Sequence, residues 1–115
     1  MTEKPIYHLA DADAFAAAKI AGSYEGTPAD RADGFIHFST AETVRESAAK
    51  HRAGQPNLLL LAVDPTVLGD ALKWEAARGG VLFPHLYGRL PVSAVLSATP
   101  LPLDAQGLHL FPNGF

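Results

Sequence analysis

Apolar and polar residues alternate in several short stretches of this chain, a pattern typical of strands with one buried face. One stretch differs, because residues 57–63 are almost continuously Leu, Ala and Val. A continuous apolar run of this length predicts a strand buried on both faces at the centre of a sheet. Further strands are expected over residues 6–10, 34–38, 72–76, 81–88 and 92–101.

Helical signals occur twice, each time directly after a predicted strand. Residues 12–21 are rich in alanine and follow Asp11, which suits the N-cap position of a helix. A second helix is expected to run from Ser39 to about Arg52. Its start is predicted by Ser39 and Glu42, which have the spacing of a capping box.

The remaining segments carry turn and loop residues. Residues 23–33 contain Gly, Pro and charged residues, and we expect an exposed loop that either covers a ligand or only connects two elements. The tail, residues 102–115, mixes large apolar residues with Gly and Pro, and we expect it to pack across the body rather than against a partner chain. No repeat or linker divides the chain, so the order of elements predicts one α+β (or α/β) domain over residues 1–115.

A few single residues add detail to the expected elements. Pro84 cannot donate a backbone hydrogen bond, which favours an edge strand or a bend there. Alternation along its strand places Trp74 toward the core and Glu75 on the other face. Val67 and Leu68 are expected to point inward from a tight turn.

Composition narrows the classes of function. The 115 residues are 48% apolar, enough for a core of their own, and the absence of cysteine excludes disulfides, zinc–thiolate sites and cysteine nucleophiles. A formal net charge of −3 without a Lys/Arg cluster argues against an extended nucleic-acid surface, while a small nucleotide needs only a few donors. No apolar run is long enough for a signal peptide or a membrane span, so we expect a cytoplasmic protein without a membrane partner.

Three of the five histidines, His8, His37 and His85, lie between apolar neighbours on strand-like segments. Such a histidine can serve as an acid, a base, a hydrogen-bond donor or a metal ligand near neutral pH, or it can simply donate to a carbonyl within the core. We expect the three to line one pocket. Three histidines also suit zinc or iron, but no HxH or HExxH spacing is present, and no metal is expected.

Other polar residues near these histidines are candidates for the same site. His37 and Ser39 share one face of their strand, and Ser39 can cap a helix while its surroundings seat a phosphate or a ribose. Glu75 is either a catalytic carboxylate or a solvated strand residue. Tyr7 and Tyr87 are placed to stack on a base or to pack in the core.

A phosphodiesterase with two H-x-[ST] motifs is one alternative function. His37-Phe38-Ser39 fits the motif, but His85-Leu86-Tyr87 has tyrosine where serine or threonine is required.

Four stretches together carry a resemblance to a known family. They are Tyr7-His8-Leu9-Ala10, Gly34-Phe35-Ile36-His37-Phe38-Ser39-Thr40-Ala41-Glu42, Lys73-Trp74-Glu75 and Phe83-Pro84-His85-Leu86-Tyr87-Gly88-Arg89-Leu90-Pro91. In this order they resemble an uncharacterised bacterial family, domain of unknown function 952, over residues 5–101, with the tail outside the match. That family is grouped by remote similarity with the ADP-ribosyltransferase-like fold. The resemblance therefore implies two helices on a split, twisted β-sheet, with NAD or a related nucleotide bound in its cleft.

The resemblance also implies roles for individual residues. His8 corresponds to the position that contacts the ribose, Ser39 to the serine of a polar second motif, and either Glu75 or His85 to the third, usually a catalytic glutamate. We therefore favour a transferase that uses NAD as a substrate, with a non-enzymatic ligand-binding module as the alternative. The predicted catalytic residues are His37, His85 and Glu75, and the predicted substrate-binding residues are His8, Ser39, Tyr7 and Tyr87.

Overall fold

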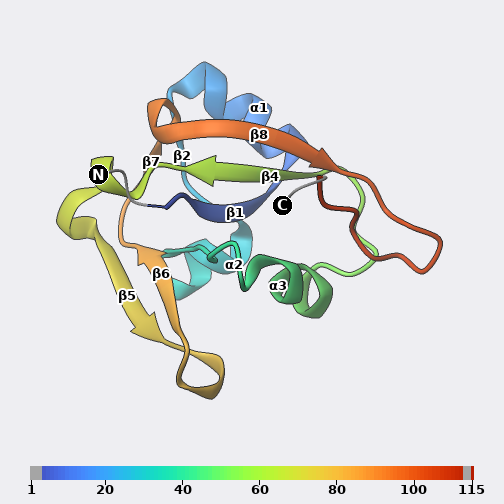
Figure 1. Ribbon diagram of the computed structural model, residues 1–115. Coiled ribbons are helices and arrows are strands. Elements are labelled where there is room, and N and C mark those ends of the chain that lie inside the picture. The colour runs from blue at the N-terminus through green and yellow to red at the C-terminus, as the bar shows by residue number, and fades with distance from the viewer. Residues whose placement is uncertain (1–3, 113–114) are drawn as a thin grey trace.

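Antiparallel strands make up most of the regular structure. The computed structural model describes residues 4–112 and 115, and within them the strands form two three-stranded sheets and a two-stranded ribbon (Figure 1). The strands are β1 (Ile6–Asp11), β2 (Ser23–Tyr24), β3 (Ile36–His37), β4 (Leu58–Val63), β5 (Leu72–Ala76), β6 (Leu82–Leu86), β7 (Leu90–Pro91) and β8 (Val95–Leu101). The larger sheet has the order β1-β4-β8, the smaller sheet has the order β3-β6-β5, and β2 pairs with β7.

Helices cover both faces of the larger sheet. The α-helices of the described residues are α1 (Ala12–Ala21), α2 (Pro28–Asp33) and α3 (Val44–His51). Short 3₁₀ turns occupy Pro65–Val67, Gly69–Ala71, Arg78–Gly80 and Val92–Ala94. Figure 1 shows α1 and α3 on opposite sides of the larger sheet. The fold is thus a small α+β domain, as predicted, with one helix more than the two expected.

The apolar run predicted to form a central strand does so. β4 lies between β1 and β8, and its Leu61 is paired with His8 on one side and Ala98 on the other. Successive β4 residues face opposite cores: Leu61 packs with the cluster that α1 completes, and Leu60 with the cluster that α3 completes. Continuous hydrophobicity was therefore required on this strand.

The two three-stranded sheets meet at one point, so the β-structure is split. Beyond the end of β3, the backbone of Ser39 exchanges two hydrogen bonds with that of Tyr7 in β1, with N–O distances of 2.7 and 2.8 Å. The sheets diverge away from this bridge, and α2 and α3 lie along the opening (Figure 1). The bridge therefore fixes the histidine of β1 next to that of β3.

The first predicted helix is confirmed with its bounds. α1 occupies Ala12–Ala21 and buries Phe15 and Ala18. It ends at Gly22, whose φ of 90° is in the left-handed region that glycine adopts readily. Asp11 occupies the N-cap position, although its side chain makes no capping hydrogen bond.

The exposed loop predicted for residues 23–33 is wrong. Its first residues pair as β2, and its last six form α2, which buries Asp30. A capping box starts this helix: Asp30 N–H donates to Thr27 Oγ1 at 3.1 Å, and Thr27 N–H donates to Asp30 Oδ2 at 2.8 Å. Pro28 at the first helical position adds to the signal. The Thr-Pro-x-Asp sequence therefore starts a helix in a segment whose composition is typical of a loop.

The capping box predicted at Ser39 is also wrong. α3 begins at Val44 with Thr43 as its N-cap residue, and Glu42 lies in an exposed turn. The backbone of Ser39 is used in the bridge to β1, which holds it extended and prevents it from starting a helix. Its hydroxyl instead hydrogen-bonds to that of Ser47, 3.1 Å away.

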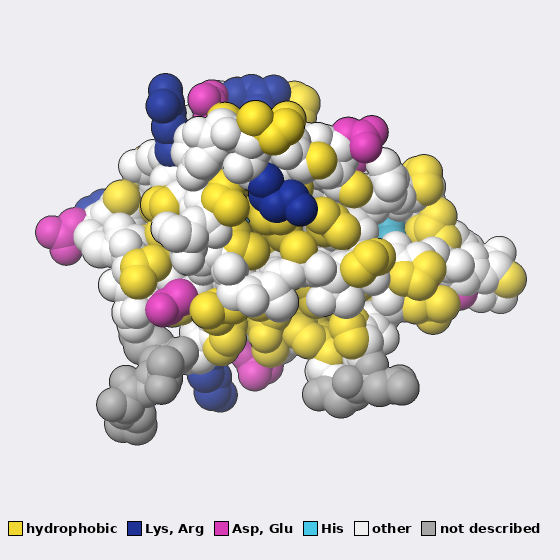
Figure 2. Space-filling view, turned by 90° about the horizontal axis from the view of Figure 1, so that it is seen from above, with side chains coloured by type: hydrophobic (Ala, Val, Ile, Leu, Met, Phe, Trp, Pro, Cys, Tyr) yellow, Lys and Arg dark blue, Asp and Glu magenta, His cyan; other side chains and the backbone are white. Residues whose placement is uncertain are grey.

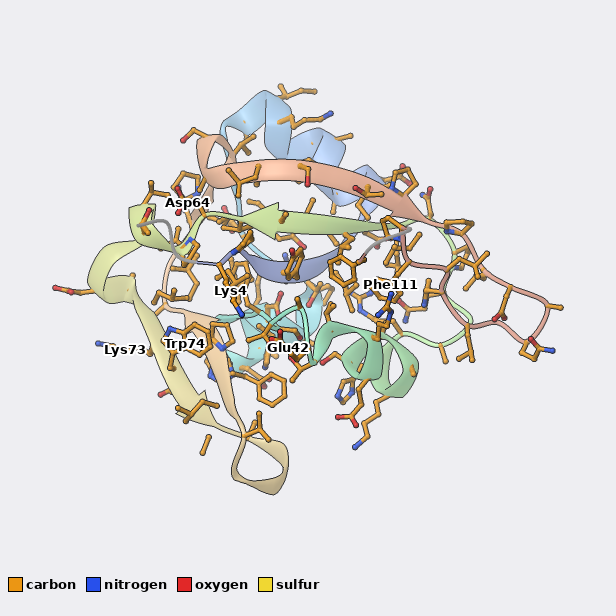
Figure 3. The ribbon with its side chains drawn as sticks, in the orientation of Figure 1. Lys4, Glu42, Asp64, Lys73, Trp74 and Phe111 are labelled. Atoms are coloured by element: carbon orange, nitrogen blue, oxygen red, sulfur yellow. The ribbon has the colours of Figure 1, made fainter. Side chains whose placement is uncertain are left out.

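Trp74 and Val67 do not point into the core as expected. Trp74 is 48% exposed, because β5 is the edge strand of the smaller sheet and has a neighbour on one side only. Figure 3 shows Lys73 and Trp74 on opposite sides of this strand. In the turn before β5, Leu68 is buried as predicted, whereas Val67 is exposed.

The edge position suggested by Pro84 is wrong, because β6 lies between β3 and β5. Pro84 C=O accepts a hydrogen bond from Phe38 N–H at 2.9 Å. In an antiparallel strand the nitrogen and carbonyl of one residue face the same neighbour, so the missing N–H also faces Phe38 and not β5. The proline therefore removes only one hydrogen bond, the one that an N–H at position 84 would donate to the Phe38 carbonyl, beyond the end of the short β3.

The tail packs against the body of the same chain, as expected. Phe111 and Phe115 stack on each other and cover the cluster completed by α3. Arg45 of α3 lies over both rings, and Phe115 meets the Tyr7 ring edge-on at 4.9 Å. Figure 3 places Phe111 beside α3. Among the described residues, no helix has the length and apolar character needed to cross a membrane.

Candidate functional site

A cavity of about 640 Å³ opens between the two sheets and is closed on other sides by α2 and α3. Its lining comprises Tyr7, His8, Leu9, Thr27, Pro28, Ala29, Asp30, Asp33, His37, Phe38, Ser39, Ser47, His51, Arg52, Gln55, Ala77, Phe83 and His85. The structure thus brings His8, His37 and His85 to one cavity from three different strands. The split of the β-structure creates this opening.

Strand pairing sets the positions of the three histidines. His37 and His85 are cross-strand partners of β3 and β6, and their ring centroids are 5.4 Å apart. His8 reaches the same place through its Nδ1–H, which donates to the His37 carbonyl at 2.7 Å. Each histidine has a different set of partners, and its chemistry differs accordingly.

Asp30 is the anion around which this end of the cavity is arranged. It is 3% exposed and accepts from His37 Nδ1–H at 2.6 Å and from the His37 backbone N–H at 3.2 Å. Burial by itself would raise the pKa of Asp30, but the hydrogen bonds from His37 and from the Thr27 N–H hold it below its ordinary value. The carboxylate is therefore ionised.

His37 is held as an imidazolium between two carboxylates. Nδ1–H donates to Asp30, and Nε2 lies 3.2 Å from Asp33 Oδ2. The Asp30 hydrogen bond raises the pKa of His37; partial burial opposes this, and the negative charge of Asp33 adds to it. With 42% of its side chain exposed, His37 can give a proton to a molecule in the cavity.

His8 is held neutral although it lies near the same aspartate. Burial lowers the pKa of His8 more than Asp30, with an oxygen 3.8 Å from its Nε2, raises it. Since Nδ1–H donates to a carbonyl, Nε2 is the acceptor of a hydrogen bond from the Tyr24 hydroxyl, 2.8 Å away. Burial in turn raises the pKa of Tyr24. Both ring nitrogens of His8 are therefore engaged within the protein.

His85 is oriented by a carboxylate behind it. Its Nδ1–H donates to Glu75 Oε1 at 2.8 Å, and the Tyr87 hydroxyl donates to the same oxygen at 2.7 Å. These two bonds lower the pKa of Glu75. Phe35 stacks on the His85 ring at 4.2 Å, which fixes its plane. Among the described residues Nε2 has no hydrogen-bond partner, and it is the nitrogen left to act on a ligand.

The other predicted site residues divide into two groups. Tyr7 and Ser39 line the cavity, whereas Glu75 and Tyr87 do not: Glu75 hydrogen-bonds to His85, and Tyr87 hydrogen-bonds to Glu75. The described residues contain no group of three or more His, Asp or Glu side chains arranged to hold a metal ion.

Sequence reasoning missed three charged residues of the cavity wall: Asp30, Asp33 and Arg52. The capping-box spacing of Thr27 and Asp30 was a usable signal for the first. The other two carried none, because their place in the cavity depends on how α2 and α3 pack against the sheets.

These features define a small α+β protein with a histidine-lined cavity at the junction of two sheets. The chain belongs to the family described as "Protein of unknown function (DUF952)", whose sequence pattern it matches over residues 9–98. No curated protein matches it.

Solved structures of protein CC0527 from Caulobacter crescentus share this fold. Its crystal structure is 50% identical, with a TM-score of 0.89 over 92% of this chain and 93% of that one. A crystal structure of a double mutant of that protein is 49% identical with the same TM-score of 0.89 and the same coverage of 92% and 93%. Its solution NMR structure is 51% identical, with a TM-score of 0.80 over 90% of each chain.

Proposed function

We propose that the cavity binds a nucleotide of the NAD or ADP-ribose type and that His37 and His85 assist transfer of its ADP-ribosyl or phosphoryl group. The observation that carries the proposal is the pair of histidines, 5.4 Å apart, each hydrogen-bonded through Nδ1 to a carboxylate. Two histidines oriented in this way can hold a proton on one ring and accept a proton on the other. That division of labour is general acid–base catalysis.

In ADP-ribosyl transfer, the bond between ribose C1′ and the nicotinamide nitrogen breaks, and nicotinamide leaves neutral with the electron pair. The acceptor forms the new bond to C1′ and gives its proton to Nε2 of His85. In phosphoryl transfer, the oxygen of the attacking hydroxyl forms the new bond to phosphorus, and its proton passes to Nε2 of His85. The leaving oxygen keeps the electrons of the broken P–O bond and takes a proton from Nε2 of His37. Once it has lost this proton, Nε2 no longer donates to Asp33.

The split sheet supports the resemblance to the ADP-ribosyltransferase-like fold. His8, however, does not fit the ribose-contacting role that the resemblance implies. A ribose contact by His8 would require it to release Tyr24 or the His37 carbonyl. We therefore propose that His8 holds the β3 backbone in place, and that Ser39 and Tyr7, which line the cavity, contact the nucleotide.

One observation favours a binding module as the second candidate. Glu75 lies outside the cavity lining, and the carboxylates within it, Asp30 and Asp33, are both paired with His37. A carboxylate free to orient a ribose is thus missing from the described cavity wall. A module of this kind would bind the nucleotide and release it unchanged.

Calorimetric titration with NAD, ADP-ribose and 2′,3′-cyclic AMP, followed by chromatography of the products, tests the proposal. We expect binding and turnover, and a loss of kcat of about 100-fold or more in His37→Gln and in His85→Gln, with affinity changed only a few-fold. The control is Glu42→Gln, an exposed site away from the cavity. Binding without product supports the module, and absence of binding by all three compounds contradicts both readings.

A further inference from the structure

Arg52 brings a positive charge to the cavity wall without a carboxylate to balance it. It directly follows α3, is half-buried, and donates through Nη2 to the Leu9 carbonyl and through Nη1 to Gln55 Oε1, both at 2.7 Å. A guanidinium has five N–H donors, so these two bonds leave three. Among the described residues no Asp or Glu oxygen lies within ion-pair distance of it.

The surroundings of Arg52 do not supply the missing negative charge. The α3 C-terminus carries a partial negative charge, but the guanidinium bonds across to β1 instead of to carbonyls of α3. The carboxylates of the cavity wall, Asp30 and Asp33, are both bound to His37. A guanidinium partly removed from water and lacking a counterion favours an anion in the space beside it.

Three further polar side chains of the cavity lining lie close to Arg52 in the sequence, on α3 and in the turn after it. Ser47 and His51 lie one turn apart on α3, and Ser47 holds the Ser39 hydroxyl at 3.1 Å. Together with Gln55 they give the Arg52 side of the cavity hydroxyl, imidazole and amide groups, which are the partners that a phosphate oxygen requires. The two lining carboxylates belong instead to α2.

We propose that Arg52 forms the seat for a phosphate or pyrophosphate group, and that it orients the ligand with its anionic part against α3 and its reacting part between His37 and His85. This inference rests on the proposed nucleotide-binding function and names the part of the wall that selects a phosphorylated ligand. It also relocates the anion seat, which the sequence suggested at a helix start near Ser39.

The test compares ADP-ribose, adenosine and inorganic pyrophosphate by calorimetry on the wild-type chain, Arg52→Gln and Arg52→Lys. The wild type is expected to prefer ADP-ribose over adenosine, and Arg52→Gln to lose about tenfold or more of this preference, because charge-assisted hydrogen bonds are removed. Arg52→Lys keeps the charge and is expected to retain part of the preference. Arg45→Gln is the matched control, because it removes an arginine charge from α3, the helix that Arg52 follows, outside the cavity lining.

The outcomes separate this inference from the proposed function. Binding of ADP-ribose and turnover of NAD that are the same in the wild type and in folded Arg52→Gln overturn the anion seat and leave the proposed function intact. Pyrophosphate binding that depends on Arg52, without binding of any nucleotide, supports the seat and contradicts the proposed function. Failure of both ADP-ribose and pyrophosphate to bind overturns the seat. Circular dichroism and the melting temperature of each variant show whether loss of the Leu9 bond has unfolded it.

Discussion

One aspartate has opposite consequences for two histidines. Asp30 favours the charged form of both His8 and His37, but His8 is buried and 4% exposed, whereas His37 is 42% exposed and directly hydrogen-bonded. Desolvation therefore decides for His8, and the hydrogen bond decides for His37. Residue identity alone does not distinguish a neutral, structural histidine from one that can donate a proton. Burial and the distance to the hydrogen-bond partner do.

The raised pKa of His37 predicts a pH-dependent contribution to stability. A raised folded-state pKa stabilises the fold fully below the unfolded value, about 6.5, and this stabilisation is lost as the pH rises through the folded value. His37→Gln should thus be less stable than the wild type at pH 6, and this deficit in the free energy of unfolding should be smaller at pH 9 by about 0.5–1 kcal/mol. The effect is modest because solvent screens the pair. Urea denaturation at the two pH values measures it. His8 is present in both proteins and its pKa is set mainly by burial, so its opposite pH dependence largely cancels. A pH-independent difference would contradict the assignment.

At the scale of elements, a single short helix connects local sequence to the site. α2 has six residues, too few to be stable without tertiary contacts. In its capping box, the side chains of Thr27 and Asp30 each accept a hydrogen bond from the other residue's backbone N–H. The same carboxylate then binds His37 in β3. The cap thereby sets the orientation of Asp30, and formation of the helix and of the site are coupled.

Thr27→Ala should lower the free energy of unfolding by about 1 kcal/mol, because the Asp30 N–H loses its capping hydroxyl. Thr27→Ser keeps the hydroxyl and should lose only a few tenths of that amount. Hydrogen exchange should speed up in α2 for the alanine variant and not for the serine variant. Equal stability of the two variants in urea denaturation would show that the cap contributes nothing measurable.

At the scale of the whole molecule, the site lies where the two sheets part. The Tyr7–Ser39 bridge joins them, and the tail secures the same strand from outside through the contact of Phe115 with Tyr7. Basic side chains are scattered over the face seen in Figure 2 and form no single patch there. Besides the histidines, three charged residues line the cavity: Asp30 and Asp33 of α2, and Arg52, which directly follows α3.

The packed tail should contribute to global stability. Phe111→Ala removes a partly buried ring from the cluster under α3, and we expect a loss of about 1–2 kcal/mol, less than for a fully buried phenylalanine. Leu108→Ala, in the same tail, is the control, because Leu108 is 44% exposed and its change should be within about 0.5 kcal/mol. Both follow from urea midpoints at constant m-value. Similar losses in the two variants would mean that Phe111 does not anchor the tail.

Local patterns in the sequence determined the elements that depend on local physics. A continuous apolar run defined β4, alanine content and a terminal glycine defined α1, and alternation placed three of the histidines on strands. Family resemblance gave the correct family. The local rules failed where a residue had a competing long-range partner: Ser39 bonds to β1 instead of capping a helix, and Pro84 lies in a central strand beside one that ends early.

Tertiary structure alone decided the composition and the electrostatics of the site. The sequence identified the three histidines but placed Asp30 in a predicted loop, because residue type does not reveal whether an aspartate is buried or exposed. Which histidine is charged depends on distances of 2.6 and 3.8 Å to that carboxylate and on how much water reaches each ring. The sequence by itself thus determined the longer strands, two of the three described α-helices and the candidate groups, since these follow from side-chain periodicity. Only the packing of α2 and α3 against a split sheet decided which groups meet, because pKa values and anion affinity depend on burial and on neighbours distant along the chain.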